Sequence, residues 1–185
     1  MANNTSIRTR NLYLLVGPSA SGKTMVANAL EDAGYNRLKT YTTRQPRYPG
    51  EEGYHFISKE AFEALGDKVF APTKYNGNYY GCTAELLDAA DIAILEPSGV
   101  CEVLAKYKTR PVVVIGISCT MNELEARMRK RGDSDDTIKS RLEIDCTLFG
   151  CMNDICNIVV NNNKDRDLTI STVKNYIDFM ENICL

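Results

Sequence analysis

The sequence predicts an α/β domain in which helices cover both faces of a parallel sheet. Three almost wholly apolar runs carry this prediction: residues 12–16 (LYLLV), 92–95 (IAIL) and 111–117 (PVVVIGI). Strands that are buried on both faces lack the polar–apolar alternation of half-exposed strands, and segments with helical spacing separate these runs. With 185 residues, the chain has room for one domain with a sizeable core.

A glycine-rich segment joins the first predicted strand to the first predicted helix. Residues 17–24 read GPSASGKT and fit the pattern G-x-x-x-x-G-K-[ST]. In this pattern the loop N–H groups face a phosphate, the lysine reaches the β- and γ-phosphates, and the Ser or Thr hydroxyl holds Mg²⁺. The sequence therefore predicts a nucleoside triphosphate site with Thr24 as the metal ligand. The predicted contacts are Gly17, Ser19, Ala20, Ser21, Gly22, Lys23 and Thr24.

Residues from about 37 to 83 are predicted to form a small β-rich insert with one helix. Gly34 ends the helix that precedes it, as a C-terminal glycine does. Short strand-like segments follow, and Asn76-Gly77 between two of them is a hairpin signal. Ser58 is placed to cap the helix.

The second half of the chain alternates helices and strands. A helix follows Thr83, Pro97 stops the strand that ends at Glu96, and residues from about 99 to 107 suit another helix. Thr120 and Glu123 have the spacing of a capping box. Ser134 is placed to cap the next helix, and residues 157–160 are the last predicted strand. The final amphipathic helix carries Leu168, Val173, Ile177 and Met180.

The charge balance argues against nucleic acid as a partner. The chain has 22 basic and 24 acidic residues, for a net charge of −2, whereas a general grip on nucleic acid needs a positive surface. No apolar run approaches the ~20 residues of a membrane span, so no membrane partner is expected. The first ten residues are polar and lack the apolar segment of a signal peptide, and we expect them to be a loose tail.

The seven cysteines indicate reduced thiols and a cytoplasmic protein, because the count is odd and no secretory signal is found. Cys146, Cys151 and Cys156 recur at five-residue intervals. Five residues rotate a side chain well off one helix face, so we interpret these three as small core residues rather than as metal ligands.

Motifs beyond the glycine-rich loop resemble the guanylate kinase family in order and spacing, over residues from about 12 to 180. They are residues 42–47 (TTRQPR), 54–56 (YHF), 77–81 (GNYYG) and the arginines at 127, 131 and 141. The resemblance implies a P-loop kinase fold with three parts. These are a core (about 11–36, 84–126 and 151–185), an insert that binds a nucleoside monophosphate (about 37–83) and a helical lid (about 127–150).

The resemblance also implies transfer of the γ-phosphoryl group of ATP, with Mg²⁺, to GMP or dGMP. The catalytic residues it implies are Lys23, Arg44, Arg127, Arg131 and Arg141. The acceptor-binding residues it implies are Thr40, Arg44, Arg47, Tyr54, Tyr80, Cys82 and Glu96. Asn161 or its neighbours would lie beside adenine. Paired guanidinium groups suit phosphate oxygens, and adjacent strand residues point to opposite faces, so we expect Tyr80 in the site and Tyr79 in a structural role.

The sequence departs from the family where the acceptor base would bind. Ala71 stands where relatives have a glutamate that accepts from guanine, Cys82 replaces a serine or threonine, and Ile94 and Glu96 replace the two aspartates of Asp-x-Asp. Another nucleotide or a ribose phosphate therefore remains an alternative acceptor. A non-catalytic binding module, like the guanylate kinase domains of membrane scaffold proteins, is a further alternative, against which the intact Lys23 argues. The sequence leaves the acceptor and the oligomeric state open.

Overall fold

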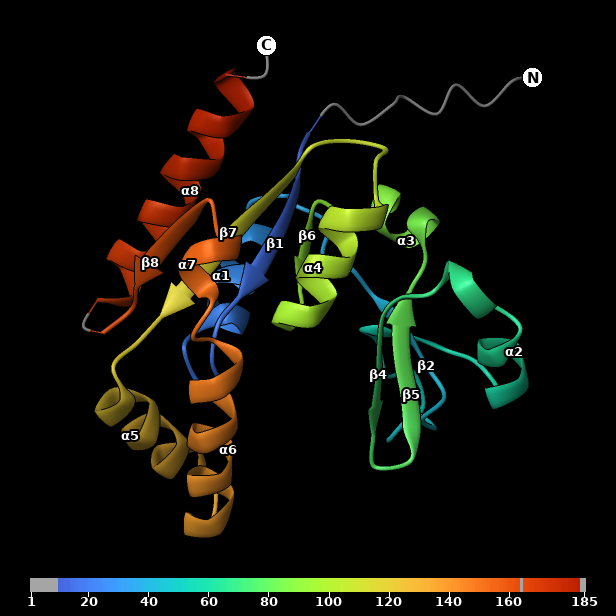
Figure 1. The fold of residues 1–185 in the computed structure, drawn as a ribbon, viewed down its shortest axis with the longest axis horizontal. Coiled ribbons are helices and arrows are strands. Elements are labelled where there is room, and N and C mark those ends of the chain that lie inside the picture. Colours follow the sequence, from blue (N-terminus) through green and yellow to red (C-terminus); the bar gives the residue numbers. More distant parts are fainter. Residues whose placement is uncertain (1–9, 164, 184–185) are drawn as a thin grey trace.

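Four parallel strands form the sheet at the centre of the protein. A computed structural model describes residues 10–163 and 165–183, so the predicted tail lies almost wholly outside the described residues. The strands stand in the order β6-β1-β7-β8, and every neighbouring pair is parallel (Figure 1). They are β1 (Leu12–Val16), β6 (Ile92–Ile94), β7 (Val112–Ser118) and β8 (Ile158–Asn161). This confirms the parallel sheet that the apolar runs predict.

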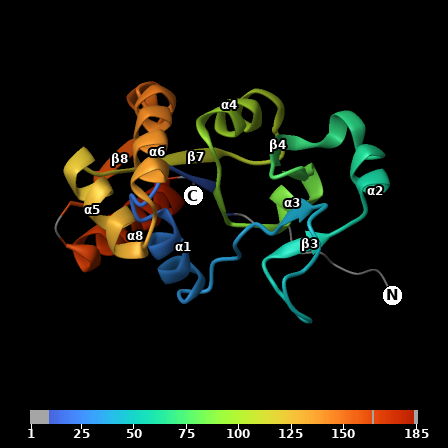
Figure 2. The ribbon, with the colours of Figure 1, turned by 90° about the horizontal axis from the view of Figure 1, so that it is seen from below.

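Helices cover both faces of this sheet, as predicted. Helices α1 (Lys23–Glu31) and α8 (Arg166–Ile183) pack on one face, and α4 (Pro97–Lys106) packs on the other (Figure 2). The short helices α3 (Ala84–Ala89) and α7 (Met152–Ile155) join the α4 side. Each face therefore has its own apolar cluster.

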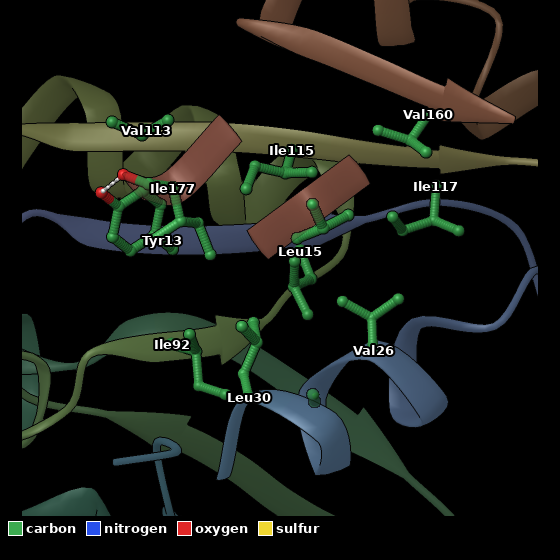
Figure 3. Close-up of a cluster of buried hydrophobic side chains, with 12 residues drawn as sticks. Tyr13, Leu15, Val26, Leu30, Ile92, Val113, Ile115, Ile117, Val160 and Ile177 are labelled. Carbon is green, nitrogen blue, oxygen red and sulfur yellow. Dashed lines mark hydrogen bonds between the residues drawn. The ribbon is translucent and has the colours of Figure 1, made fainter. Parts of the chain in front are cut away.

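Strand β1 divides its side chains between the two clusters. Tyr13 and Leu15 point toward α1 and α8, where Val26, Leu30 and Ile177 meet them (Figure 3). The alternate residues of the strand join the opposite cluster. The Tyr13 hydroxyl donates to Glu181 Oε1 of α8 at 2.5 Å and lies 3.4 Å from the Ile177 carbonyl oxygen. A strand buried on both faces needs apolar side chains at every position, which is why residues 12–16 show no alternation.

The predicted insert forms a second, four-stranded sheet in the order β3-β2-β5-β4. Its strands are β2 (Thr40–Thr42), β3 (Tyr54–Phe56), β4 (Phe70–Tyr75) and β5 (Asn78–Cys82), and its helices are α2 (Lys59–Glu63) and the single 3-10 turn η1 (Gly66–Lys68). The Asn76-Gly77 turn joins β4 to β5 in a hairpin, and the Ser58 hydroxyl accepts from the Ala61 N–H at 3.1 Å to cap α2. Both local predictions are confirmed.

Two further helices follow β7 and lie side by side at one end of the core (Figure 1). Helix α5 (Met121–Arg131) ends at Gly132, whose φ of +91° lies in the left-handed region. Helix α6 (Asp135–Leu148) is capped as predicted, because the Ser134 hydroxyl accepts from the Thr137 N–H. Leu124, Met128 and Ile138 bury the contact between the two helices.

Two sequence predictions about helices α5 and α8 are wrong in detail. Thr120 precedes α5, but its side chain caps no N–H group, and the Glu123 carboxylate accepts from Arg127 instead. Leu168 is 63% exposed, so α8 packs through Val173 and Ile177. In the first case a stronger, charge-assisted partner lies one turn away.

The start of α4 and the environment of the cysteines also differ from prediction. Pro97 stops the strand but also occupies the first turn of α4, where its missing N–H costs nothing, so the helix begins earlier than predicted. Cys146 and Cys151 are exposed, so the core interpretation is wrong for them, while Cys156 is half-buried.

Among the described residues, no group of three or more His, Cys, Asp or Glu is arranged to hold a metal ion. No helix in residues 10–163 and 165–183 has the length and apolarity to cross a membrane.

Candidate active site

The glycine-rich loop between β1 and α1 has a backbone that its two glycines make possible. Gly17 has φ +155° and Gly22 has φ +109°. A Cβ on Gly17 would lie 2.2 Å from the Ile117 carbonyl oxygen, and one on Gly22 would lie 2.3 Å from the Asn162 side-chain nitrogen. Any side chain at either position would therefore displace a neighbouring element. Among the described residues, the buried hydroxyl of Ser21 has no hydrogen-bond partner.

The same loop is tied to the segment after β8, which lies two strands away from β1 in the sheet, and to α5. Asn162, directly after β8, donates from Nδ2 to the Ser21 carbonyl oxygen at 2.7 Å. Arg127 of α5 donates to the carbonyl oxygens of Ala20 at 3.3 Å, Ser21 at 3.4 Å and Asn162 at 2.6 Å. These bonds satisfy the carbonyl groups of Ala20 and Ser21 and fix that part of the loop against β8 and α5.

Lys23 lies at the N-terminus of α1 with its ammonium folded over the loop. The Nζ atom donates to the carbonyl oxygens of Gly17 at 2.7 Å and Pro18 at 2.8 Å. Burial lowers the pKa of Lys23 to about 8, and the negative charges of Asp145 and Glu96 oppose that shift. The ammonium is therefore a poorly hydrated charge, which an anionic ligand would stabilise.

A cleft of about 720 Å³ separates this loop from the insert. The loop contributes Gly17, Ser19 and Lys23 to its lining. Arg141, which belongs to α6, also lines it, and so does Glu96, which follows β6. The cleft thus brings together predicted residues that are more than 100 positions apart in the chain.

The insert supplies two arginines to the far end of the cleft, as predicted. Arg44 donates to both carboxylate oxygens of Glu51, at 2.8 and 3.1 Å, and the Arg47 N–H donates to the same carboxylate at 2.7 Å. Only 15% of the Arg44 side chain and 7% of the Glu51 side chain are exposed. The hydrogen bonds from Arg44, then the one from Arg47, lower the pKa of Glu51 to about 2. Glu51 therefore orients the Arg44 guanidinium and holds the backbone at Arg47.

Two tyrosines complete this end of the cleft. Tyr54 and Tyr80 both line it, their ring centroids lie 6.0 Å apart, and the Arg44 guanidinium lies over the Tyr54 ring. Tyr79 points the other way and stacks on Phe62 with ring centroids 5.6 Å apart. The opposite roles predicted for the adjacent tyrosines are confirmed in their geometry.

Four residues line the wall between these two ends: Thr40, Ala71, Cys82 and Glu96. Burial raises the pKa of the Cys82 thiol to about 12, and that thiol donates to the Phe70 carbonyl oxygen at 3.7 Å. Ala71 lies at an irregularity of β4 with φ +51°, and its N–H donates to the Glu102 carboxylate at 2.8 Å. Among these four residues, Glu96 is the one that carries a carboxyl group, and the Cys82 thiol stays protonated at neutral pH.

The predicted lid arginines occupy three different environments. Arg141 alone among them lines the cleft. Arg127 is engaged by the loop carbonyls described above, and Arg131 forms an ion pair with Asp133. Asn161 is exposed at the end of β8, where its side-chain oxygen accepts from the Asn163 N–H. Of the three predicted lid arginines, Arg141 is therefore the one that faces the cleft, and the catalytic role of all three stays a prediction.

The donor set around the loop suits Mg²⁺ held mainly by phosphates and water. The Thr24 side chain is exposed at the second position of α1, and Glu96 lines the cleft nearby, where its charge acts on Lys23. Mg²⁺ in phosphoryl-transfer sites takes one or two protein oxygens together with phosphate oxygens. These oxygens and the unsatisfied Ser21 hydroxyl fit a Mg²⁺–nucleotide complex.

Three residues of the site escape the sequence analysis. Glu51 lies in the connection between β2 and β3, after the Thr-Thr-Arg motif. Asn162 lies in a run of three asparagines, and Asp145 lies four residues after Arg141. Four residues along a helix return to the same face, so that last spacing could have pointed to Asp145. The other two act through contacts that only folding creates.

Comparison with known proteins places the chain in a family. A family model described as guanylate kinase matches residues 9–180. Guanylate kinase from Agrobacterium fabrum is 35% identical over 151 residues, which cover 74% of this chain and 69% of that protein. Guanylate kinase from Shewanella violacea is 31% identical over 173 residues, covering 85% and 83%.

A solved structure shares the fold described above. The crystal structure of guanylate kinase from Anaplasma phagocytophilum has a TM-score of 0.63 and 23% sequence identity, and the match covers 94% of this chain and 87% of that chain. With its phosphate-binding loop and its insert on either side of one cleft, the chain belongs to the guanylate kinase family.

Proposed function

We propose that this protein transfers the γ-phosphoryl group of ATP to GMP or dGMP, giving ADP and GDP or dGDP. One observation carries the proposal: a single cleft is lined by Lys23 of the phosphate loop at one end and by Arg44, Arg47, Tyr54 and Tyr80 at the other. Phosphoryl transfer between two nucleotides needs two phosphate sites that face each other across a space closed to water. The family relationship supports the same reaction.

The phosphate loop would hold ATP. Its N–H groups and the N-terminus of α1 would bind the β-phosphate, and Lys23 would exchange the carbonyl oxygens of Gly17 and Pro18 for phosphate oxygens. Mg²⁺, when bound through the Thr24 hydroxyl, neutralises charge between the β- and γ-phosphates. Asn161 remains a candidate neighbour of the adenine.

The insert would hold the acceptor. Arg44, held by Glu51, and Arg47 present guanidinium groups to the acceptor phosphate, and the hydroxyls of Tyr54 and Tyr80 add donors. The acceptor phosphate is an anionic nucleophile, so the reaction needs no general base. Arg141 reaches the cleft from α6 and would stabilise charge on the migrating phosphoryl group, where Arg127 and Arg131 join it only after the lid rearranges.

Glu96 would read the guanine base. It supplies a carboxylate to the wall between the two phosphate sites, and a carboxylate accepts from both N1–H and the exocyclic amine of guanine. Thr40 would face O6. Cys82 would shape the wall of the base pocket more than it would bind the base by hydrogen bonds, because its S–H already donates to the Phe70 carbonyl oxygen. We expect the enzyme in the cytoplasm, in line with the cysteine usage of the sequence.

The reaction is tested by measuring ADP release from Mg²⁺–ATP in the presence of GMP, dGMP, AMP, CMP, UMP, dTMP or ribose bisphosphate. We expect turnover with GMP and dGMP well above the rest. Turnover with ribose bisphosphate alone would identify that compound as the acceptor in place of GMP. A protein that is inactive with every acceptor would contradict the proposal and favour a binding module.

The role of Glu96 is tested by Glu96→Gln and Ala71→Glu. Each charge-assisted hydrogen bond to the base is worth about 1.5–3 kcal/mol, so Glu96→Gln should raise the KM for GMP by at least about 10-fold and leave that for ATP nearly unchanged. Ala71→Glu should lower the KM for GMP and sharpen discrimination against AMP, which has no N1 proton. Glu63→Gln, an exposed acid of α2, is the matched control. Equal effects of Glu96→Gln on both substrates would assign Glu96 to the metal side of the site.

A further inference from the structure

Asp145 of α6 places a carboxylate on the phosphate loop. Its Oδ2 atom accepts from the Ser19 N–H at 2.7 Å, and the residue is only 8% exposed. It lines the main cleft and also a smaller cavity of about 210 Å³ behind the loop, beside Pro18 and Phe149. An acidic side chain of the predicted lid is thus enclosed where the loop meets the cleft.

This carboxylate uses a donor that the loop would otherwise offer to a phosphate. A buried carboxylate only accepts hydrogen bonds, so it needs donors and positive charge. Here it has the Ser19 N–H and the nearby ammonium of Lys23, whose charged form it stabilises. A loop N–H and this lysine are also what a loop of this type gives to a nucleotide phosphate.

Asp145 and a bound phosphate therefore exclude each other. Both are anions, and both would require the Ser19 N–H within hydrogen-bonding distance. The loop also has little freedom to shift, because Asn162 and Arg127 hold its carbonyl groups from the other side. A phosphate entering the loop must displace Asp145, and with it the segment of α6 that carries the residue.

That displacement acts on Arg141, which lies one helical turn before Asp145 and lines the same cleft. Residues four apart on a helix share a face and move together. Leaving the loop would free this face of α6 to shift against the bound nucleotide. The position of Arg141 is thereby coupled to whether the loop holds a phosphate or the carboxylate.

We propose that Asp145 is a tethered competitor of the ATP phosphates, which holds the phosphate loop and α6 in the nucleotide-free state and is displaced when ATP binds. This inference rests on the proposed function, since it assumes that the loop binds ATP. It makes Asp145 a positioning residue that lowers the affinity for ATP and links nucleotide entry to the movement of Arg141.

The first test is equilibrium binding of ATP, with and without Mg²⁺, by calorimetry of the unmodified protein, Asp145→Asn and Asp145→Ala. If the carboxylate occupies the loop in about nine molecules of ten, removing its charge should lower the Kd for ATP about 10-fold. Glu143→Gln, an exposed acid on the same helix, should leave the Kd unchanged. An unchanged or higher Kd in Asp145→Asn, with or without Mg²⁺, would overturn the inference.

The second test follows α6 in the unmodified protein and so does not depend on a variant that folds. Inorganic tripolyphosphate, which has no base to close the lid upon, should raise the amide hydrogen exchange of residues 141–149 as Asp145 leaves the loop. In Asp145→Asn the exchange should be high before tripolyphosphate is added and should rise no further. Exchange that tripolyphosphate leaves unaltered in the unmodified protein contradicts the inference.

The two proposals fail in different ways. A protein that binds no ATP, whether unmodified or changed at Asp145, contradicts the proposed function and this inference together. Equal affinity of the unmodified protein and both variants contradicts this inference alone.

Discussion

Lys23 carries a positive charge on a side chain that is partly withdrawn from water. Its ammonium donates to the carbonyl oxygens of Gly17 and Pro18, and burial lowers the pKa of Lys23 to about 8. The energy that an ammonium loses by leaving water is recovered when phosphate oxygens approach it. Burial therefore raises the free energy of the charged form of Lys23, and an anion that binds beside it lowers that free energy again.

The change Lys23→Ala should cut kcat roughly 10²-fold or more, because this charge follows the migrating phosphoryl group. The Tm should stay the same or rise slightly, since the substitution removes a poorly hydrated charge from the folded state. Steady-state kinetics and thermal melts check both statements, with Lys130→Ala on the exposed surface of α5 as the control. Turnover near that of the unmodified enzyme would contradict the catalytic role of Lys23.

The lowered pKa of Lys23 also predicts a pH dependence. Below about pH 8 the free enzyme carries the charged ammonium, and above that pH the proton is lost, so kcat/KM for ATP should fall as the pH rises from about 8 toward 10. The value of kcat should persist to higher pH, because bound phosphates raise the pKa of the lysine again. Lys23→Arg should abolish the fall, since a guanidinium stays charged over this range. A flat profile for the unmodified enzyme up to pH 10 would refute this expectation.

At the scale of elements, the turn between β2 and β3 organises the acceptor site. Arg44 and Arg47 precede the middle of this turn and Glu51 follows it. Hydrogen bonds from both arginines to the Glu51 carboxylate therefore connect the two sides of the turn. A pKa of about 2 keeps Glu51 ionised at any working pH, so the contribution of the pair to stability is present above the ordinary pKa of a glutamate. That contribution is lost only as the pH falls toward about 2.

The change Glu51→Gln should raise the KM for the acceptor about 10-fold, because the Arg44 guanidinium loses its charged partner and the backbone at Arg47 is held less firmly, so that the substrate must order them. The KM for ATP should change little, since the phosphate loop lies at the other end of the cleft. Glu52→Gln is the matched control, because the neighbouring Glu52 side chain is 89% exposed and forms an ion pair with Lys39 at 3.9 Å. Equal effects of the two substitutions would show that Glu51 has no special role.

At the scale of the whole molecule, the two substrate sites stand on different sheets. The phosphate loop follows a strand of the core sheet, whereas Arg44, Tyr54 and Tyr80 follow or lie on strands of the insert (Figures 1 and 2). Transfer requires the reacting phosphates to meet with water excluded. The insert (about 37–83) and the lid (about 127–150) should therefore move toward the core when both substrates bind.

Small-angle scattering tests this closure. A compact chain of this length has a radius of gyration of about 16 Å. That radius should decrease measurably with a bisubstrate analogue that joins adenosine to guanosine through phosphates, and it should decrease less with ATP alone. A scattering curve that saturating analogue leaves unchanged would rule out closure of the three parts.

Local patterns in the sequence were sufficient for most of the fold. Buried parallel strands demand continuous apolar runs, the Asn76-Gly77 dipeptide demands a hairpin, and Ser58 and Ser134 act on N–H groups within three residues of themselves. The phosphate loop is recognisable because its eight-residue pattern is contiguous, although the space that its two glycines leave is taken by Ile117 and Asn162, which lie about 100 or more positions away. For the hairpin and the two serine caps, the interaction that decides the structure lies next to the residue in the chain.

Side-chain partners that meet across the fold could not be predicted in this way. Residue patterns along the chain were enough to predict the phosphate loop, the order of the elements and the two arginines of the insert. The folded structure was needed to show that Asp145 accepts from the Ser19 N–H, that Arg127 donates to the loop carbonyl oxygens, and that Cys146 is exposed. These outcomes depend on the distance between elements brought together by packing, which is a property of the folded chain and of no segment within it.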